Sequence, residues 1–217
     1  MFLINYKTYR ESTGENAERL IQVIDEVALE YKNVSFVSCP QAVDLRNSIA
    51  KANHEVWMQH IDPGERGRQT GFIPARIAKE VGAVGALLNH SEHKLSVGVL
   101  GETMAKCKEV GLKTLVFADG LEEAMMITKF QPDYIGYEPP ELVASKETSV
   151  SKSKPEVIEK VVKEVPSAPI IVGAGVKEMR DVEVALRLGA KGIAIASAVV
   201  LASDQKKIIN ELASAFR

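Results

Sequence analysis

Eight short apolar runs, separated by segments with helical periodicity, restrict the fold of this chain more than any other feature. The runs cover residues 2–5, 34–39, 55–61, 84–89, 113–118, 133–138, 169–173 and 192–197. Between and after them lie helix-like segments at 17–31, 43–51, 74–81, 101–110, 121–129, 155–165, 179–188 and 204–216. A short run without polar alternation is typical of a strand that is buried on both faces of a parallel sheet. The strict alternation therefore predicts an α/β protein.

The length of the repeat distinguishes between two parallel architectures. Eight units in 217 residues average about 27 residues each, which favours a compact, single-domain (β/α)₈ barrel over residues 1–217. Gly82, Gly111 and Gly189 each stand between a helix-like segment and a strand, where a left-handed residue closes a helix. A doubly wound sheet remains an alternative, because a strand count from sequence can be wrong by one or two.

Composition excludes several classes of function. The 27 basic and 29 acidic residues leave a net charge of −2, which indicates neither a nucleic-acid surface nor a basic membrane-bound helix. Two scattered cysteines are too few for a disulfide framework or a zinc site. No basic leader and no apolar run of spanning length is found, so we expect a cytoplasmic protein.

Glu138 is the first candidate catalytic residue. It ends the run Tyr134-Ile135-Gly136-Tyr137, and the two prolines that follow cannot donate to a strand ladder. A carboxylate at the carboxyl end of a parallel strand lies where α/β enzymes place acid–base groups. The alternative is a helix N-cap or a solvated loop acid.

Other polar or small residues follow the remaining strands. They are Asn5, Lys7, His60, Asn89, His90, Gly173 to Gly175, Ala196 and Ser197. In a barrel these positions share one rim, although taken singly Lys7 could be a solvated lysine and His90 could bond only its neighbours. His90 and His93 have helical spacing for a metal, but no further ligand completes such a site, so no metal is expected.

Five motifs together resemble one family. They are Asn5-Tyr6-Lys7-Thr8-Tyr9, Asn89-His90-Ser91-Glu92, Tyr137-Glu138-Pro139-Pro140-Glu141, Gly173-Ala174-Gly175-Val176 and Ala196-Ser197. In this order, over nearly the whole chain, they resemble the signatures of triosephosphate isomerases in their short archaeal form. The resemblance implies a TIM barrel that interconverts dihydroxyacetone phosphate and glyceraldehyde 3-phosphate in glycolysis and gluconeogenesis, with no metal or organic cofactor.

The resemblance also implies the catalytic roles. Glu138 would be the base that moves a proton between adjacent carbons, and a neutral His90 would polarise the carbonyl oxygens, as is established for the family. Lys7 would hold a positive charge beside the enediolate oxygen. Asn5 would orient Lys7 and the substrate, and Glu92 would lie near Lys7.

For the phosphate group, the resemblance implies backbone N–H donors at Gly175, Ala196 and Ser197, with Val143 near the substrate. Gly175 could equally serve a tight βα turn. The family usually carries a Gly-Thr-Gly tip in the loop after the base, whereas this chain has no glycine in residues 142–151. We nevertheless expect this loop to close over the substrate, because exclusion of water protects an enediol phosphate.

In the family, the loop at residues 60–71 docks into a neighbouring subunit, so the resemblance implies a homodimer or a homotetramer. Two alternatives remain for the function. One is another phosphate-binding barrel enzyme of aldolase or synthase type, although Lys113 starts a strand and the other lysines fall mostly in helices or loops. The other is a non-catalytic phosphate-binding barrel.

Overall fold

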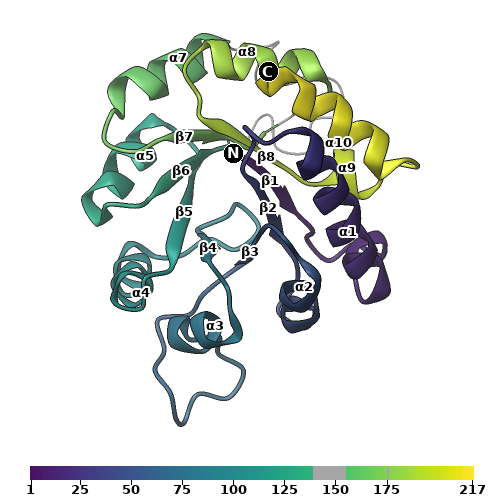
Figure 1. Cartoon of the computed structure of the whole chain (residues 1–217). Helices are drawn as coiled ribbons and strands as arrows, with labels where there is room; N and C mark the ends of the chain where they lie inside the picture. The colour runs from purple at the N-terminus through teal and green to yellow at the C-terminus, as the bar shows by residue number, and fades with distance from the viewer. Residues whose placement is uncertain (139–154, 175) are drawn as a thin grey trace.

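A closed parallel barrel forms the centre of the molecule (Figure 1). The structure, a computed structural model of the chain, describes residues 1–138, 155–174 and 176–217. The described strands are β1 (Phe2–Asn5), β2 (Phe36–Cys39), β3 (Glu55–Met58), β4 (Gly85–Leu88), β5 (Lys113–Ala118), β6 (Tyr134–Tyr137), β7 (Ile170–Val172) and β8 (Gly192–Ile195). Each strand pairs with the next in sequence, and β1 pairs with β8. The predicted (β/α)₈ fold is confirmed.

The helices lie around the outside of this barrel (Figure 1). Those described are α1 (Glu15–Glu30), α2 (Leu45–Lys51), α3 (Ala75–Val81), α4 (Val97–Glu109), α5 (Leu121–Ile127), α7 (Pro155–Glu164), α8 (Met179–Arg187), α9 (Ser197–Val200) and α10 (Gln205–Ala213), with 3₁₀ turns η1 (Arg10–Ser12), η2 (Thr128–Phe130) and η3 (Ser214–Phe216). Helices α2, α3 and α5 have only seven residues each, in keeping with the predicted compact variant.

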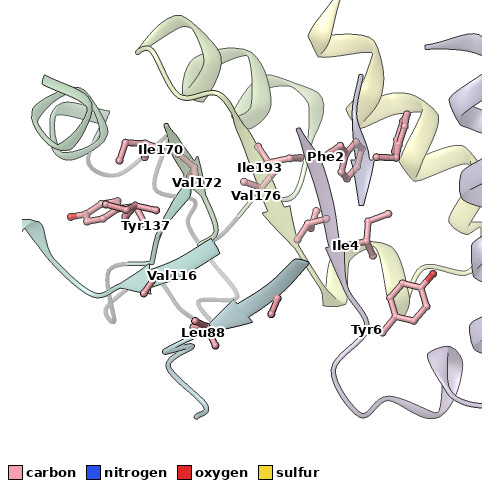
Figure 2. Close-up of a cluster of buried hydrophobic side chains, with 14 of the residues drawn as sticks. Phe2, Ile4, Tyr6, Leu88, Val116, Tyr137, Ile170, Val172, Val176 and Ile193 are labelled. Atoms are coloured by element: carbon pink, nitrogen blue, oxygen red, sulfur yellow. The ribbon is translucent and has the colours of Figure 1, made fainter. Parts of the chain in front are cut away.

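Two apolar layers explain why the strands look continuously hydrophobic in sequence. Leu3 packs in an inner cluster with Trp57, Leu87 and Phe117, from other strands of the barrel. Phe2 and Ile4, its neighbours in β1, pack in the larger cluster that includes the helices. Figure 2 shows part of this outer layer, with side chains from β1 and from β4 to β8. Successive strand residues therefore alternate between two buried faces.

Several predicted boundaries differ from the structure. The third strand ends at Met58 rather than at residue 61, so His60 lies in the loop that follows. The eighth strand ends at Ile195, because Ala196 leaves the extended region and Ser197 begins α9. Helix α4 begins four residues earlier than predicted, since the Ser96 hydroxyl accepts a hydrogen bond from Val99 N and caps it.

The glycine predictions are confirmed. Gly82, Gly111 and Gly189 have φ of +111°, +67° and +98°, the left-handed region that glycine adopts without strain. Across the described part of the chain, no helix is both long enough and apolar enough to cross a bilayer.

Candidate active site

A polar cavity of about 470 Å³ opens at the carboxyl ends of β1, β3 and β4. Its lining residues are Asn5, Lys7, Thr8, Tyr9, Gln59, His60, His90, Glu92 and His93. Glu138, directly after β6, lies beside this cavity: its Oε2 is 3.5 Å from Nε2 of the lining residue His90. The structure thus brings Lys7, His90 and Glu138, predicted from three separate motifs, to one end of the barrel.

Glu138 is fixed by the strands on either side of it. Its backbone N–H donates to Ala118 O of β5 at 3.0 Å, which continues the pairing of β6 with β5 by one residue. On the other side Gly173 follows β7, and a Cβ atom there would overlap with the Glu138 carboxyl group. Gly173, predicted to lie on the functional rim, therefore makes room for this side chain.

The environment of Glu138 favours a base that works near neutral pH. The residue is 6% exposed, and Oε2 is buried without a hydrogen-bond partner among the described residues. Burial raises the pKa of Glu138 to about 7, against the opposing effect of the Lys7 charge. A carboxylate with few donors has a higher basicity than a solvated one.

His90 is held as a neutral imidazole with a defined tautomer. The backbone N–H of Glu92 donates to His90 Nδ1 at 3.1 Å, so Nδ1 carries the lone pair. The proton of the neutral ring then resides on Nε2, which faces Glu138. Burial, followed by the nearby charge of Lys7, lowers the pKa of His90 to about 4. The ring also packs edge-on against Phe117, with centroids 4.9 Å apart.

Lys7 adopts a backbone conformation that is uncommon for a lysine, with φ of +49°. Its N–H donates to Asn5 Oδ1 at 3.0 Å, which closes a short turn after β1. Its ammonium group lies 2.7 Å from Glu92 Oε1. The side chain is thereby aimed across the cavity toward β4, as the expected proximity of Glu92 and Lys7 requires.

Gln59 is a site residue that the sequence interpretation missed. Its Nε2 lies within hydrogen-bond distance of three oxygens: Asn5 Oδ1 (3.2 Å), Lys7 O (3.1 Å) and Cys39 O (3.0 Å). It therefore ties the Lys7 turn to β2 and β3. The available signal was a polar residue directly after the apolar part of the third strand, but a strand predicted to run to residue 61 places His60, rather than Gln59, at the rim.

His60 and His93 also line the cavity. Their rings stack on each other with centroids 3.9 Å apart and an interplanar angle of 18°, at the edge of the cavity. Residues 1–138, 155–174 and 176–217 contain no cluster of three or more His, Cys, Asp or Glu side chains that could hold a metal ion.

The candidate phosphate-binding residues are only partly described. Ile195 pairs with Ile4, so Ala196 and Ser197 lie at the same rim as Asn5. Ser197 is exposed at the start of α9, where the first N–H groups of a helix have no acceptor within it. Gly175, Val143 and the loop at residues 142–151 lie outside the described residues.

Comparisons with known proteins agree on one family. The family model "Triosephosphate isomerase" matches residues 1–212. The triosephosphate isomerase of Methanothermus fervidus is 39% identical over 216 residues, covering 98% of this chain and 96% of the relative. That of Methanocaldococcus jannaschii is 38% identical, covering 98% of each protein, and that of Saccharolobus solfataricus is 36% identical, covering 100% of this chain and 96% of the relative.

Proposed function

The chain belongs to the triosephosphate isomerase family, and from that premise we propose that it interconverts dihydroxyacetone phosphate and D-glyceraldehyde 3-phosphate through an enediolate, with Glu138 as base and His90 as electrophile. The buried pair of Glu138 and His90 supports this proposal most directly. Glu138 Oε2 and His90 Nε2 are 3.5 Å apart, and burial shifts the pKa of the glutamate up to about 7 and that of the histidine down to about 4. Above about pH 7, such a pair supplies an ionised base beside a neutral N–H donor.

The reaction moves one proton between adjacent carbons and needs no redox partner. The Glu138 carboxylate takes a proton from C1 of dihydroxyacetone phosphate, and the electron pair of that C–H bond shifts to form the enediolate, with negative charge on the carbonyl oxygen. His90 Nε2–H hydrogen-bonds this oxygen and exchanges protons between the two oxygens. Glu138 then returns its proton to C2. Substrate and product have the same composition.

Lys7 supports the charge that develops in this step. Its ammonium group lines the same cavity as His90, held by Glu92 and by the turn that Asn5 and Gln59 fix. A charge that is in place before the reaction costs little reorganisation when the enediolate forms.

The proposal is tested by NMR with dihydroxyacetone phosphate in D₂O. We expect D-glyceraldehyde 3-phosphate to form with deuterium at C2, because the proton on Glu138 can exchange with solvent between its removal and its return. Deuterium exchange into the substrate without glyceraldehyde 3-phosphate would favour an enzyme of aldolase or synthase type. Binding of the substrate without either change would favour a non-catalytic barrel, and both results would contradict the proposal.

Ser197 tests the phosphate site. If the phosphate lies against the start of α9, Ser197→Glu places a like charge next to it and should raise KM roughly tenfold, the effect of about 1–2 kcal/mol of repulsion. The kcat should change little, because the reacting carbons are held elsewhere. Ser197→Ala is the matched control, since it leaves the proposed backbone donor in place and should keep KM within about twofold. An unchanged KM in Ser197→Glu would place the phosphate elsewhere.

The quaternary state is a further proposal. Phe72, an apolar side chain directly after the loop at residues 60–71, is 50% exposed. We propose that this loop docks into a neighbouring subunit of a homodimer or homotetramer. Sedimentation of a fully active monomer would contradict this. A role in glycolysis and gluconeogenesis, and a cytoplasmic location, stay predictions.

A further inference from the structure

Asn89 connects β4 to the catalytic histidine through an uncommon backbone conformation. Three non-glycine residues of the described chain have positive φ, namely Lys7, Asn89 and Gln131, at +49°, +57° and +55°. Lys7 and Asn89 flank the candidate active site, whereas Gln131 ends the 3₁₀ turn η2. Asn89 is 2% exposed. Asparagine is among the few non-glycine residues that adopt this φ readily, and its buried amide can make hydrogen bonds that glycine cannot.

The amide of Asn89 joins three parts of the barrel rim. Its Nδ2 donates to Phe117 O of β5 at 2.9 Å and to Glu123 Oε1 of α5 at 2.8 Å. Its Oδ1 accepts from Leu95 N at 3.0 Å, at the far end of the turn that contains His90. The orientation of the amide is well determined, because a flipped group would place its oxygen against two acceptors.

The side chain of Asn89 therefore closes the turn that carries His90. His93 N donates to His90 O at 2.8 Å, and Glu92 N donates to the His90 ring, so the turn already has internal bonds. Those bonds fix its shape but do not attach it to the barrel. Phe117 supplies both the carbonyl that Asn89 holds and the ring against which His90 packs.

The acceptor on α5 is itself held in place. Glu123 Oε2 accepts from Asp119 N at 2.7 Å and from Lys94 Nζ at 3.0 Å. Lys94 also pairs with Asp119 Oδ2 at 2.8 Å. A carboxylate with this many fixed donors is a rigid anchor for the Asn89 amide.

We propose that Asn89 is a positioning residue for His90. Its side chain attaches the turn at residues 89–95 to β5 and α5, so that Nδ1 stays on the Glu92 N–H and Nε2 stays within reach of Glu138. Asn89 acts through His90 and touches neither the reacting carbons nor their oxygens. The inference rests on the proposed role of His90, and it adds a residue on which the geometry of the electrophile depends.

The test is Asn89→Gly, which still permits the left-handed backbone and removes the side chain with its amide. We expect kcat to fall about tenfold, since small displacements of a catalytic group cost one to two orders of magnitude. KM should stay within about twofold, because substrate binding depends on other groups. Gln131→Gly is the matched control. It also replaces an amide side chain by glycine at nearly the same φ, loses one side-chain hydrogen bond, from Lys108, and should leave both constants unchanged.

A second measurement does not depend on turnover. In ¹⁵N NMR of the histidine rings, with the His90 signals identified by their loss in His90→Gln, the wild type should show one tautomer protonated on Nε2. Asn89→Gly should show both tautomers. Were the wild type inactive, the proposed function would fail, but this spectrum would still decide whether Asn89 holds the ring.

Wild-type kcat together with a single Nε2 tautomer in Asn89→Gly would overturn the inference. If circular dichroism shows that this variant does not fold, Glu123→Ala provides the second route. It leaves Asn89 in place and removes one of its two acceptors, together with the contacts of that carboxylate to Asp119 N and Lys94, and we expect a kcat decrease of about three- to tenfold. Wild-type kcat in that variant would count against the proposal equally.

Discussion

Glu138→Gln is expected to lower kcat by about 10³-fold, within the 10²- to 10⁴-fold range of general acid–base catalysis. Glutamine has the same shape, so the packing beside Gly173 and His90 is retained, but it cannot accept a proton from carbon. KM should change little. The measurement is steady-state kinetics in a coupled assay for glyceraldehyde 3-phosphate. Glu26→Gln, the same change at an exposed surface pair with Lys206, is the control and should have wild-type kinetics.

The pH profile of the wild type follows from the same residue. Only ionised Glu138 is a base, so kcat/KM should fall as the pH drops through about 7, the pKa that burial gives this carboxyl group. His90 contributes no second fall in this range, because burial keeps its pKa at about 4 and the ring remains neutral. A profile that is flat from pH 8 to pH 5, or an active Glu138→Gln variant, would remove Glu138 from the role of base.

The stability of the Glu138→Gln variant should change in the opposite direction to its activity. The folded-state pKa of Glu138 is raised from its ordinary 4.5 to about 7, so the folded protein loses stability as the pH rises from 4.5 to 7. Above pH 7 the ionised, buried carboxylate costs about 3 kcal/mol, and glutamine lacks this cost. We therefore expect Glu138→Gln to have a higher Tm at pH 8, with little difference below pH 4.5. An inactive but more stable protein would exclude misfolding as the cause of the lost activity.

Most of the fold could be predicted from the sequence, because strands that are buried on both faces appear as short, continuously apolar runs. Every predicted strand contains an observed one, and the glycines after the helices have the expected conformation. The errors lie at strand and helix ends, where a single residue decides the outcome. Ser96 caps α4 with its hydroxyl, and Ala196 turns the chain so that Ser197 starts a helix.

The site shows a different limit of sequence interpretation. Glu138 could be placed at the rim of the barrel because prolines end its strand, and the roles proposed for Lys7 and His90 come from the resemblance to a family. The tautomer of His90 could not be found in this way, since it depends on the backbone N–H of Glu92. Gln59 and the amide of Asn89 were also missed as supports, because their partners are backbone carbonyls and side chains far away in sequence.

Lys7→Met is expected to lower kcat/KM by about 10²- to 10³-fold, the usual effect of removing one preorganised group that stabilises developing negative charge. Methionine keeps the apolar length of the lysine stem, and the turn that Asn5 and Gln59 hold through backbone atoms stays intact. The loss should therefore come from the missing charge. Lys7→Arg, which retains the charge in a different shape, should lose less activity than Lys7→Met in the same assay.

Lys7 has a second effect, which separates its electrostatic role from a structural one. After burial, the charge of Lys7 is the largest influence on the pKa of Glu138, and it lowers that pKa. The residual activity of Lys7→Met should therefore fall at a higher pH than the wild type does. Glu92 raises the same pKa, so Glu92→Gln should move the acid limb to lower pH. Shifts in the same direction for both variants, or no shift in either, would show that Lys7 does not act on the base through its charge.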